Sequence, residues 1–123
     1  MQNSKINNLV INPELTIETL KRIIEDSKRQ AAEAARVIEA RYGDCGACGF
    51  SWVEIHGVKG NTRLGRMLKR VVGVGQGYNR AFHIWNPSGL LVQSVLIKEA
   101  GAIACAKYLR DFGFNAYAVS RLD

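Results

Sequence analysis

Hydrophobic positions divide the chain into one long helical segment followed by shorter segments. Between residues 13 and 42, apolar and small side chains recur at alternating steps of four and three, the spacing of a coiled-coil-like seam. The seam consists of Leu20, Ile24, Ser27, Ala31, Ala34 and Ile38. Asn12 is placed to cap such a helix, Pro13 suits its first position, and Gly43 suits its end. The pattern predicts a long helix over residues 13–42.

The predicted helix is long for the size of the chain. At 1.5 Å per residue it would span about 45 Å, whereas a compact domain of this length is only about 35 Å across. Its small side chains would let two helix backbones approach closely at Ala31, Ala32, Ala34 and Ala35. We therefore expect the helix to overhang its own domain and pack on a second copy. The alternative is a helix that breaks near Ser27 and folds back on one domain.

Beyond residue 43 the predicted helices and strands are shorter. Alternating positions predict strands over residues 50–56, 81–85 and 114–119, with a short extended stretch over 90–93. Helical spacing predicts helices over 61–72, capped by Asn61 or Thr62, and over 94–112, capped by Ser94. A flexible connection over 73–79 and a turn over 86–89 complete this part. We expect an α+β or small α/β domain: a long N-terminal helix, then a three- to four-stranded sheet with two packed helices.

Composition and charge narrow the class of protein. The chain has 123 residues, 47% hydrophobic and 23% charged, which suits one globular domain over residues 1–123. It contains no apolar run long enough to span a membrane and starts without the features of a signal peptide, so we expect a cytoplasmic protein. The net charge of +6 favours an anionic partner, although solubility alone would also explain a mild excess of this kind.

Cys45 and Cys48 form a Cys-x-x-Cys pair in a glycine-rich bend. A structural zinc site needs four ligands, and only Cys105 and His56 are left to complete one. A redox pair would normally open a helix, but this pair precedes a strand. We expect it to pack in a tight turn where glycine allows left-handed backbone, and we predict no metal and no cofactor. No motif fixes Cys48 and His56 as nucleophile and base, so we expect a protein that is not an enzyme.

The loop before the short helix is a candidate phosphate site. It comprises Lys59, Gly60, Asn61 and Thr62. The N-terminus of a helix presents unpaired N–H groups and a positive dipole end, and Arg63 and Arg66 would add charge. The spacing is not that of a P-loop, and an ordinary capped loop fits these residues equally well.

The run from Phe82 to Ser88 is a candidate nucleotide site. Aromatic rings such as Trp85 stack on purines, and the Asn86 amide can pair with a base edge. Arg110 and Arg121 would supply cations for phosphate. Because a small domain also needs aromatic side chains in its core, the core is the commoner place for Phe82 and Trp85.

Several short motifs together resemble one family. They are Gly43-Asp44-Cys45-Gly46, Phe50-x-Trp52-Val53, Lys59-Gly60-Asn61-Thr62-x-Leu64-Gly65, Trp85-Asn86-Pro87-Ser88, Lys98-Glu99-Ala100-Gly101-Ala102 and Ser120-Arg121-Leu122-Asp123. From Ala31 to Asp123 the chain resembles the first Thoeris anti-defence family of small phage proteins. It departs from the pattern at Val119, where a small residue is expected.

The resemblance implies a sponge for immune signals. Such proteins bind and sequester cyclic ADP-ribose-type signals of bacterial TIR immune proteins without cleaving them. Some members also hold cyclic oligonucleotides in separate sites, and members form dimers or hexamers built from dimers. This chain would then act as a homo-oligomer in the cytoplasm of an infected bacterial host.

Residue type and motif position assign two candidate sites under this interpretation. The signal site would use Phe82, Trp85 and Asn86 for the base and Arg110 and Arg121 for phosphate. The oligonucleotide-type site would use Ser27, Arg29, Lys59, Gly60, Asn61 and Thr62.

Two other classes remain open at this stage. The helix that carries Arg63, Arg66, Lys69 and Arg70 would suit a small basic DNA- or RNA-binding protein. A cysteine-dependent or zinc enzyme built on Cys45 or Cys48 is the other.

Overall fold

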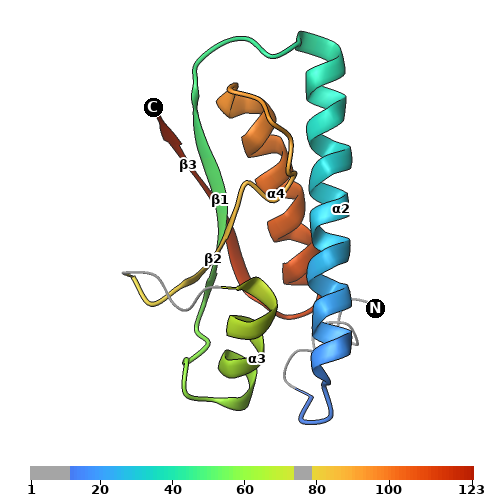
Figure 1. Ribbon diagram of the computed structural model, residues 1–123, viewed down its shortest axis with the longest axis vertical. Coiled ribbons are helices and arrows are strands. Elements are labelled where there is room, and N and C mark those ends of the chain that lie inside the picture. The colour runs from blue at the N-terminus through green and yellow to red at the C-terminus, as the bar shows by residue number, and fades with distance from the viewer. Residues whose placement is uncertain (1–11, 74–78) are drawn as a thin grey trace.

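The computed structural model describes residues 12–73 and 79–123 and has the α+β fold expected from the sequence. Its elements are α2 (Ile17–Tyr42), β1 (Gly49–His56), α3 (Arg63–Val72), β2 (Phe82–Trp85), α4 (Val95–Asp111) and β3 (Asn115–Leu122). Figure 1 shows the long helix α2 alongside α4, with α3 near its N-terminal end. No helix in the described ranges is both long and apolar enough to cross a membrane.

The sheet has three antiparallel strands, with β1 between β2 and β3. Trp52 of β1 lies opposite Trp85 of β2 on one side and Val119 of β3 on the other. The strand β3 is longer than predicted and runs to Leu122. The extended stretch expected over 90–93 is not a strand and adds no fourth member to the sheet; next to it, Ser94 forms a single bridge with Cys48.

The helix α2 begins four residues later than predicted. Asn12 does not cap it, because the Asn12 side chain accepts a hydrogen bond from the amide of Glu14 and forms a separate turn. The cap is Thr16, whose hydroxyl accepts a hydrogen bond from the amide of Thr19. Gly43 ends the helix as expected, with a positive φ of 74°.

The predicted seam of α2 faces α4 of the same chain. Leu20, Ile24, Ser27 and Ala31 are buried, and α4 packs along them while its other side lies against β1 and β3. The helix is continuous through Ser27, as predicted, and the alternative of a helix broken there is excluded. These four residues therefore close the fold of one chain and are not left for a second copy, whereas Ala34 and Ile38 of the seam are only partly buried.

Small side chains bring α2 and α4 close together, as predicted for two copies but here within one chain. A Cβ atom added to Gly101 of α4 would lie 3.2 Å from the Ala31 carbonyl oxygen and 2.9 Å from Cβ of Ser88. The helix α3 packs near the N-terminal end of α2, and Arg63 donates a hydrogen bond to the carbonyl of Leu15, two residues before α2 begins. The helices α4 and α3 of the same chain therefore pack along most of the length of α2.

The short helix α3 forms where the sequence predicts it. Its cap is Thr62, whose hydroxyl accepts from the amide of Gly65 and donates to the carbonyl of Lys59. A side chain at Gly65 would collide with the same Lys59 carbonyl, so glycine is required for this tight entry. Of the flexible connection predicted over 73–79, residues 74–78 lie outside the described part of the chain.

Candidate functional site

One side of the sheet is packed against the helices, and the other side carries a cluster of aromatic and titratable residues. On β1, Val53 and Ile55 enter the core, whereas the alternate residues point the opposite way. We call this second side the open face, since no helix in the described ranges covers it. Its residues are Phe50, Trp52, Glu54, His56, His83, Trp85, Asn115, Tyr117, Val119 and Arg121.

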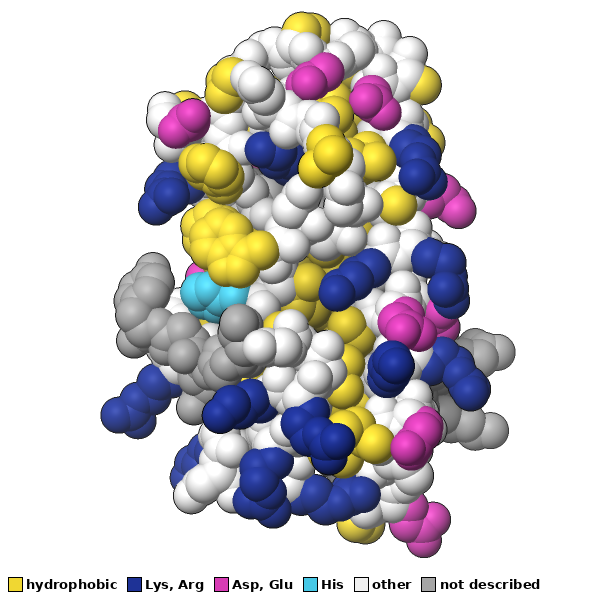
Figure 2. Space-filling model, viewed as in Figure 1, with side chains coloured by type: hydrophobic (Ala, Val, Ile, Leu, Met, Phe, Trp, Pro, Cys, Tyr) yellow, Lys and Arg dark blue, Asp and Glu magenta, His cyan; other side chains and the backbone are white. Residues whose placement is uncertain are grey.

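Two tryptophans stack at the middle of the open face. The rings of Trp52 and Trp85 lie 4.5 Å apart between centroids at an interplanar angle of 31°. Trp52 on the central strand is 7% exposed, whereas Trp85 on the edge strand is 53% exposed. Figure 2 shows a large hydrophobic side chain beside a histidine at the left of the molecule. The pair therefore offers a supported aromatic surface to solvent.

Two cations lie over an aromatic ring at one end of the open face. The Lys98 ammonium is 5.2 Å from the ring centroid of Phe50, and the Arg121 guanidinium carbon is 5.6 Å from it. Lys98 also donates a hydrogen bond of 2.8 Å to the carbonyl of Gly49. A small hollow lies beside them, lined by Cys48, Gly49, Phe50, Gln93, Lys98 and Asp123. This end of the face can attract an anion.

A carboxylate organises the centre of the open face. Glu54 is 7% exposed and accepts hydrogen bonds from Nε1 of Trp52 at 2.9 Å and Nδ2 of Asn79 at 3.0 Å. Nε2 of His56 lies 2.9 Å from one carboxylate oxygen, and Nε2 of His83 lies 3.7 Å from the other. Burial by itself would raise the pKa of Glu54, but these hydrogen bonds and the nearby His83 together hold the pKa below its ordinary value.

The arrangement suits binding better than acid–base chemistry. Because the oxygens of Glu54 are engaged by three hydrogen-bonding side chains, the carboxylate is poorly placed to accept a proton from a substrate. His56 uses Nε2 for Glu54, and its ring meets Tyr117 edge-on at 6.0 Å between centroids. Within the described ranges, no group of three or more His, Cys, Asp or Glu residues is arranged to hold a metal ion.

The structure brings together two of the five residues predicted for the signal site. Trp85 and Arg121 both lie on the open face. Phe82 does not, because it is 1% exposed in the core. The side-chain amide of Asn86 closes the turn after β2 by donating a hydrogen bond to the Leu90 carbonyl, so it is not free to pair with a base. Arg110 donates to the Ala116 carbonyl at the start of β3, the opposite end from Arg121.

Sequence reasoning missed most of the open face. Phe50, Trp52 and Glu54 stand at alternate positions of one predicted strand, and Asn115, Tyr117 and Val119 stand at alternate positions of another. This period of two was the available signal for a shared face. The pairing of the three strands, which joins these residues to Trp85 and Arg121, was not available from the sequence.

The residues predicted for an oligonucleotide-type site are divided among three places: the loop before α3, the core and the outer side of α2. Lys59, Gly60 and Asn61 line an open hollow together with Arg80, and Thr62 is occupied in capping α3. Ser27 is fully buried, where it donates to the Ile24 carbonyl and accepts from the Cys105 thiol. Burial also raises the pKa of that thiol. Ser27 therefore cannot reach a ligand at the loop.

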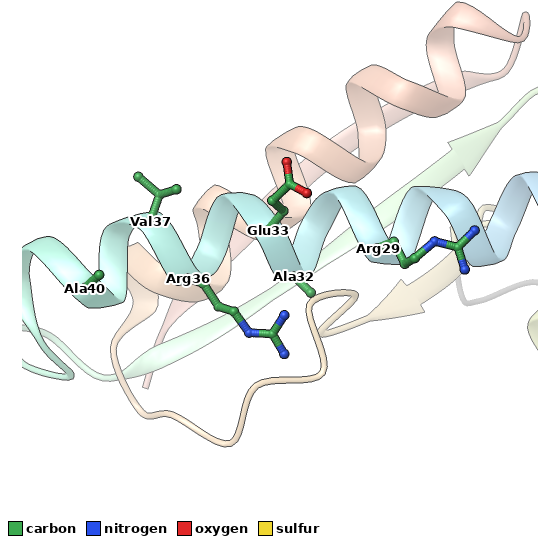
Figure 3. A pocket seen from close by; sticks show the side chains of 6 residues that line it. All are labelled: Arg29, Ala32, Glu33, Arg36, Val37 and Ala40. Atoms are coloured by element: carbon green, nitrogen blue, oxygen red, sulfur yellow. The ribbon is translucent and has the colours of Figure 1, made fainter.

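Arg29 lies on the outer side of α2, where it pairs with Asp26. It lines a shallow groove together with Ala32, Glu33, Arg36, Val37 and Ala40 (Figure 3). Arg29 and Arg36 point to the same side of the helix, and Glu33 points to the other (Figure 3). This groove is not continuous with the loop at Lys59, so Arg29 does not join the predicted second site.

The two cysteines of the glycine-rich bend are exposed, not packed as predicted. The Cys45 thiol donates to the Tyr42 carbonyl at 3.2 Å, and the Cys48 thiol lies 3.5 Å from the Gln93 side-chain oxygen. The predicted left-handed glycine is confirmed at Gly46, with a φ of 88°.

Comparison with protein-family models, with curated proteins and with solved structures finds no match to this chain.

Proposed function

We propose that the chain binds and sequesters a cyclic nucleotide signal of the cyclic ADP-ribose type on the open face, without breaking its bonds. The observation that carries this proposal is the exposed Trp85 ring, stacked on Trp52, on the same face as Arg121 and Phe50, whose ring the Lys98 ammonium of α4 also approaches. A nucleotide needs an aromatic plane for its base and cations for its phosphates. Sequestration would take place in the cytoplasm of an infected bacterial cell.

The spacing of these groups suits a nucleotide. Trp85 and Arg121 belong to the two strands that flank β1, which lie about 10 Å apart, and the register offsets Arg121 from Trp85 by two residues, about 7 Å, along the strands. A nucleotide can bridge such a distance because its base and its phosphate lie on opposite sides of the sugar. The buried negative charge of Glu54 would repel phosphate from the centre of the face and favour the Arg121 end.

The test is thermal unfolding of the purified protein with a panel of cyclic ADP-ribose isomers and cyclic oligonucleotides, followed by mass spectrometry of the ligand released by heat. A ligand that binds only the native state raises Tm in proportion to RT ln(1 + [L]/Kd). We expect a large shift and recovery of the intact ligand. Recovery of an altered ligand would make the protein an enzyme, and the absence of any shift across the panel would refute the proposal.

Matched variants locate the site. Arg121→Gln removes a positive charge from the open face, and Lys107→Gln removes one from an exposed position on α4. We expect the first variant to weaken ligand binding about tenfold or more and the second to leave it unchanged. Equal affinities for the two variants would place the ligand away from Arg121.

A second candidate function is nucleic-acid binding by α3. Its side chains Arg66, Lys69 and Arg70 are exposed, and the neighbouring hollow carries Lys59 and Arg80. Figure 2 shows the dark blue basic side chains gathered at the lower end of the molecule, where α3 lies in Figure 1. This function predicts affinity for DNA or RNA that falls steeply with salt and is weakened by Lys69→Gln together with Arg70→Gln. The cyclic nucleotide proposal predicts that this double variant binds its ligand normally.

A further inference from the structure

The backbone of β3 presents a row of unpaired groups along one edge of the sheet. Asp123 continues the pairing with β1 by donating its amide to the Cys48 carbonyl, so the odd-numbered residues of β3 turn their backbone groups toward β1. The backbone N–H and C=O groups of the even-numbered residues therefore point away from β1. These residues are Ala116, Ala118, Ser120 and Leu122. Arg110 satisfies the Ala116 carbonyl. Across the described ranges, the outward groups of Ala118, Ser120 and Leu122 have no hydrogen-bond partner.

This edge lacks the features that prevent an exposed strand from pairing with a strand of another chain. Proteins shield edge strands by making them short or by placing proline, bulges or several charges in them. The other edge strand, β2, has only 4 residues, whereas β3 has 8 residues, no proline, and Arg121 as its one charged side chain. The edge of β3 is therefore suited to accept another strand.

We propose that β3 pairs with β3 of a second copy of this chain in antiparallel orientation, about a two-fold axis at Val119, to give a continuous six-stranded sheet. The outward groups allow hydrogen bonds only between even-numbered residues, so Ala118 of one copy pairs with Ser120 of the other. An axis at Val119 meets this condition and uses nearly the whole strand. It also places Tyr117 of each copy opposite Arg121 of the other, on the open face.

The pair of Tyr117 and Arg121 favours a second copy over an unrelated peptide. Tyr117 is about half exposed, and a guanidinium over its ring would form a cation–π contact twice, once on each side of the axis. Moving the axis to Ala118 would place Arg121 opposite Asn115 and lose both contacts. With the axis at Val119, the two open faces become one surface, and the second copy adds its Tyr117 beside Arg121. This inference does not depend on the identity of any ligand.

Disulfide trapping tests both the surface and the register. In a Cys45→Ser, Cys48→Ser background, Val119→Cys would place two thiols at the axis, where Cα atoms of opposed residues are about 4.5 Å apart, within disulfide range. Asn115→Cys is the matched control on the same strand and face, because its two copies would be about 26 Å apart. We expect a covalent dimer from the first under mild oxidation and none from the second.

The oligomeric state gives an independent readout. Sedimentation equilibrium should show a dimer or a multiple of it, and Ser120→Pro should raise the dissociation constant of the dimer about tenfold or more, since it removes one outward N–H from each copy. Circular dichroism checks that the variant is folded. A wild-type protein that stays monomeric, or a dimer that Val119→Cys does not trap, would overturn the proposal.

Discussion

A carboxylate oxygen of Glu54 lies 2.9 Å from Nε2 of His56, two residues further along the same strand. The pair stands on the side of the sheet away from the helices, where water would ordinarily solvate a carboxylate. Glu54 is nevertheless almost buried, because Trp52, Asn79 and His83 also surround it. Contacts with one carboxylate therefore hold the side chains of Trp52, His56 and His83 in place at the centre of the open face.

Replacement of this charge should destabilise the fold. In Glu54→Gln, the amide keeps one oxygen but turns an NH2 group toward donors such as Nε1 of Trp52. We expect a loss of about 1–3 kcal/mol in the free energy of unfolding near pH 7, measured by urea denaturation. Glu33→Gln on the exposed side of α2 is the control, with an expected change within about 0.5 kcal/mol.

The effect of Glu54→Gln should also depend on pH. The pKa of Glu54 in the folded protein lies below its ordinary value of 4.5, so its contribution is complete above that pH and is lost as the pH falls through the folded-state pKa. The difference in unfolding free energy between wild type and variant should therefore shrink in acid. A difference that stays constant from pH 7 to the acid limit of folding would show that lost packing, not charge, causes the effect.

The two helix caps should differ in strength. Thr62 caps α3 through a side-chain hydrogen bond to the Gly65 amide, whereas Ser94 at the start of α4 makes no such bond. We expect Thr62→Ala to cost about 1 kcal/mol of stability and Ser94→Ala distinctly less, measured by chemical denaturation. Thr62→Ser, which keeps the hydroxyl, should recover most of the loss.

The close approach at Gly101 gives a prediction of coupling. Gly101→Ala would gain helix propensity but place a Cβ atom 2.9 Å from that of Ser88, and overpacking of this kind costs about 1–3 kcal/mol. We expect Gly101→Ala to destabilise the protein and the double variant with Ser88→Gly to lose less than the sum of the two single changes. Strict additivity in the double-mutant cycle would exclude the contact as the cause.

Tryptophan fluorescence should report on the proposed site. Trp52 and Trp85 are the only two tryptophans of the chain, and Trp85 is the exposed one. A base that stacks on Trp85 should quench its emission in a Trp52→Phe protein. Trp85→Ala should weaken binding of the same ligand about 5- to 150-fold, whereas Trp85→Phe should retain most of the affinity because an aromatic plane remains. Equal affinity in all of these proteins would place the base elsewhere.

Much of the local structure could be predicted from the sequence because local rules decide it. The period of the apolar positions located α2 and the strands β1, β2 and β3, and the expected cap at Asn61 or Thr62 located the start of α3. The start of α2 was predicted too early because Asn12 and Thr16 both suit a cap. The fragment over 90–93 stayed outside the sheet, although its sequence suits an extended conformation.

The composition of the open face depended on strand order. The pleat puts Phe82 and Trp85 on opposite faces of one strand, but only the packing of the helices decides that Phe82 enters the core and Trp85 stays exposed. Nothing in the sequence indicates which of Arg110 and Arg121 lies on the open face. In the structure, Arg110 donates to the Ala116 carbonyl at the start of β3, whereas Arg121 lies near the end of that strand.

The sequence by itself determined which segments become helices and strands, because periodicity, caps and glycines act within a few residues. Only the tertiary structure decided what those segments face. It turned the seam of α2 onto α4, and it placed Glu54 among Trp52, His56 and His83 on one side of the sheet. The physical reason is that burial and pairing depend on residues distant in the chain, whose positions follow from the order β2-β1-β3 and the packing of the helices on one side.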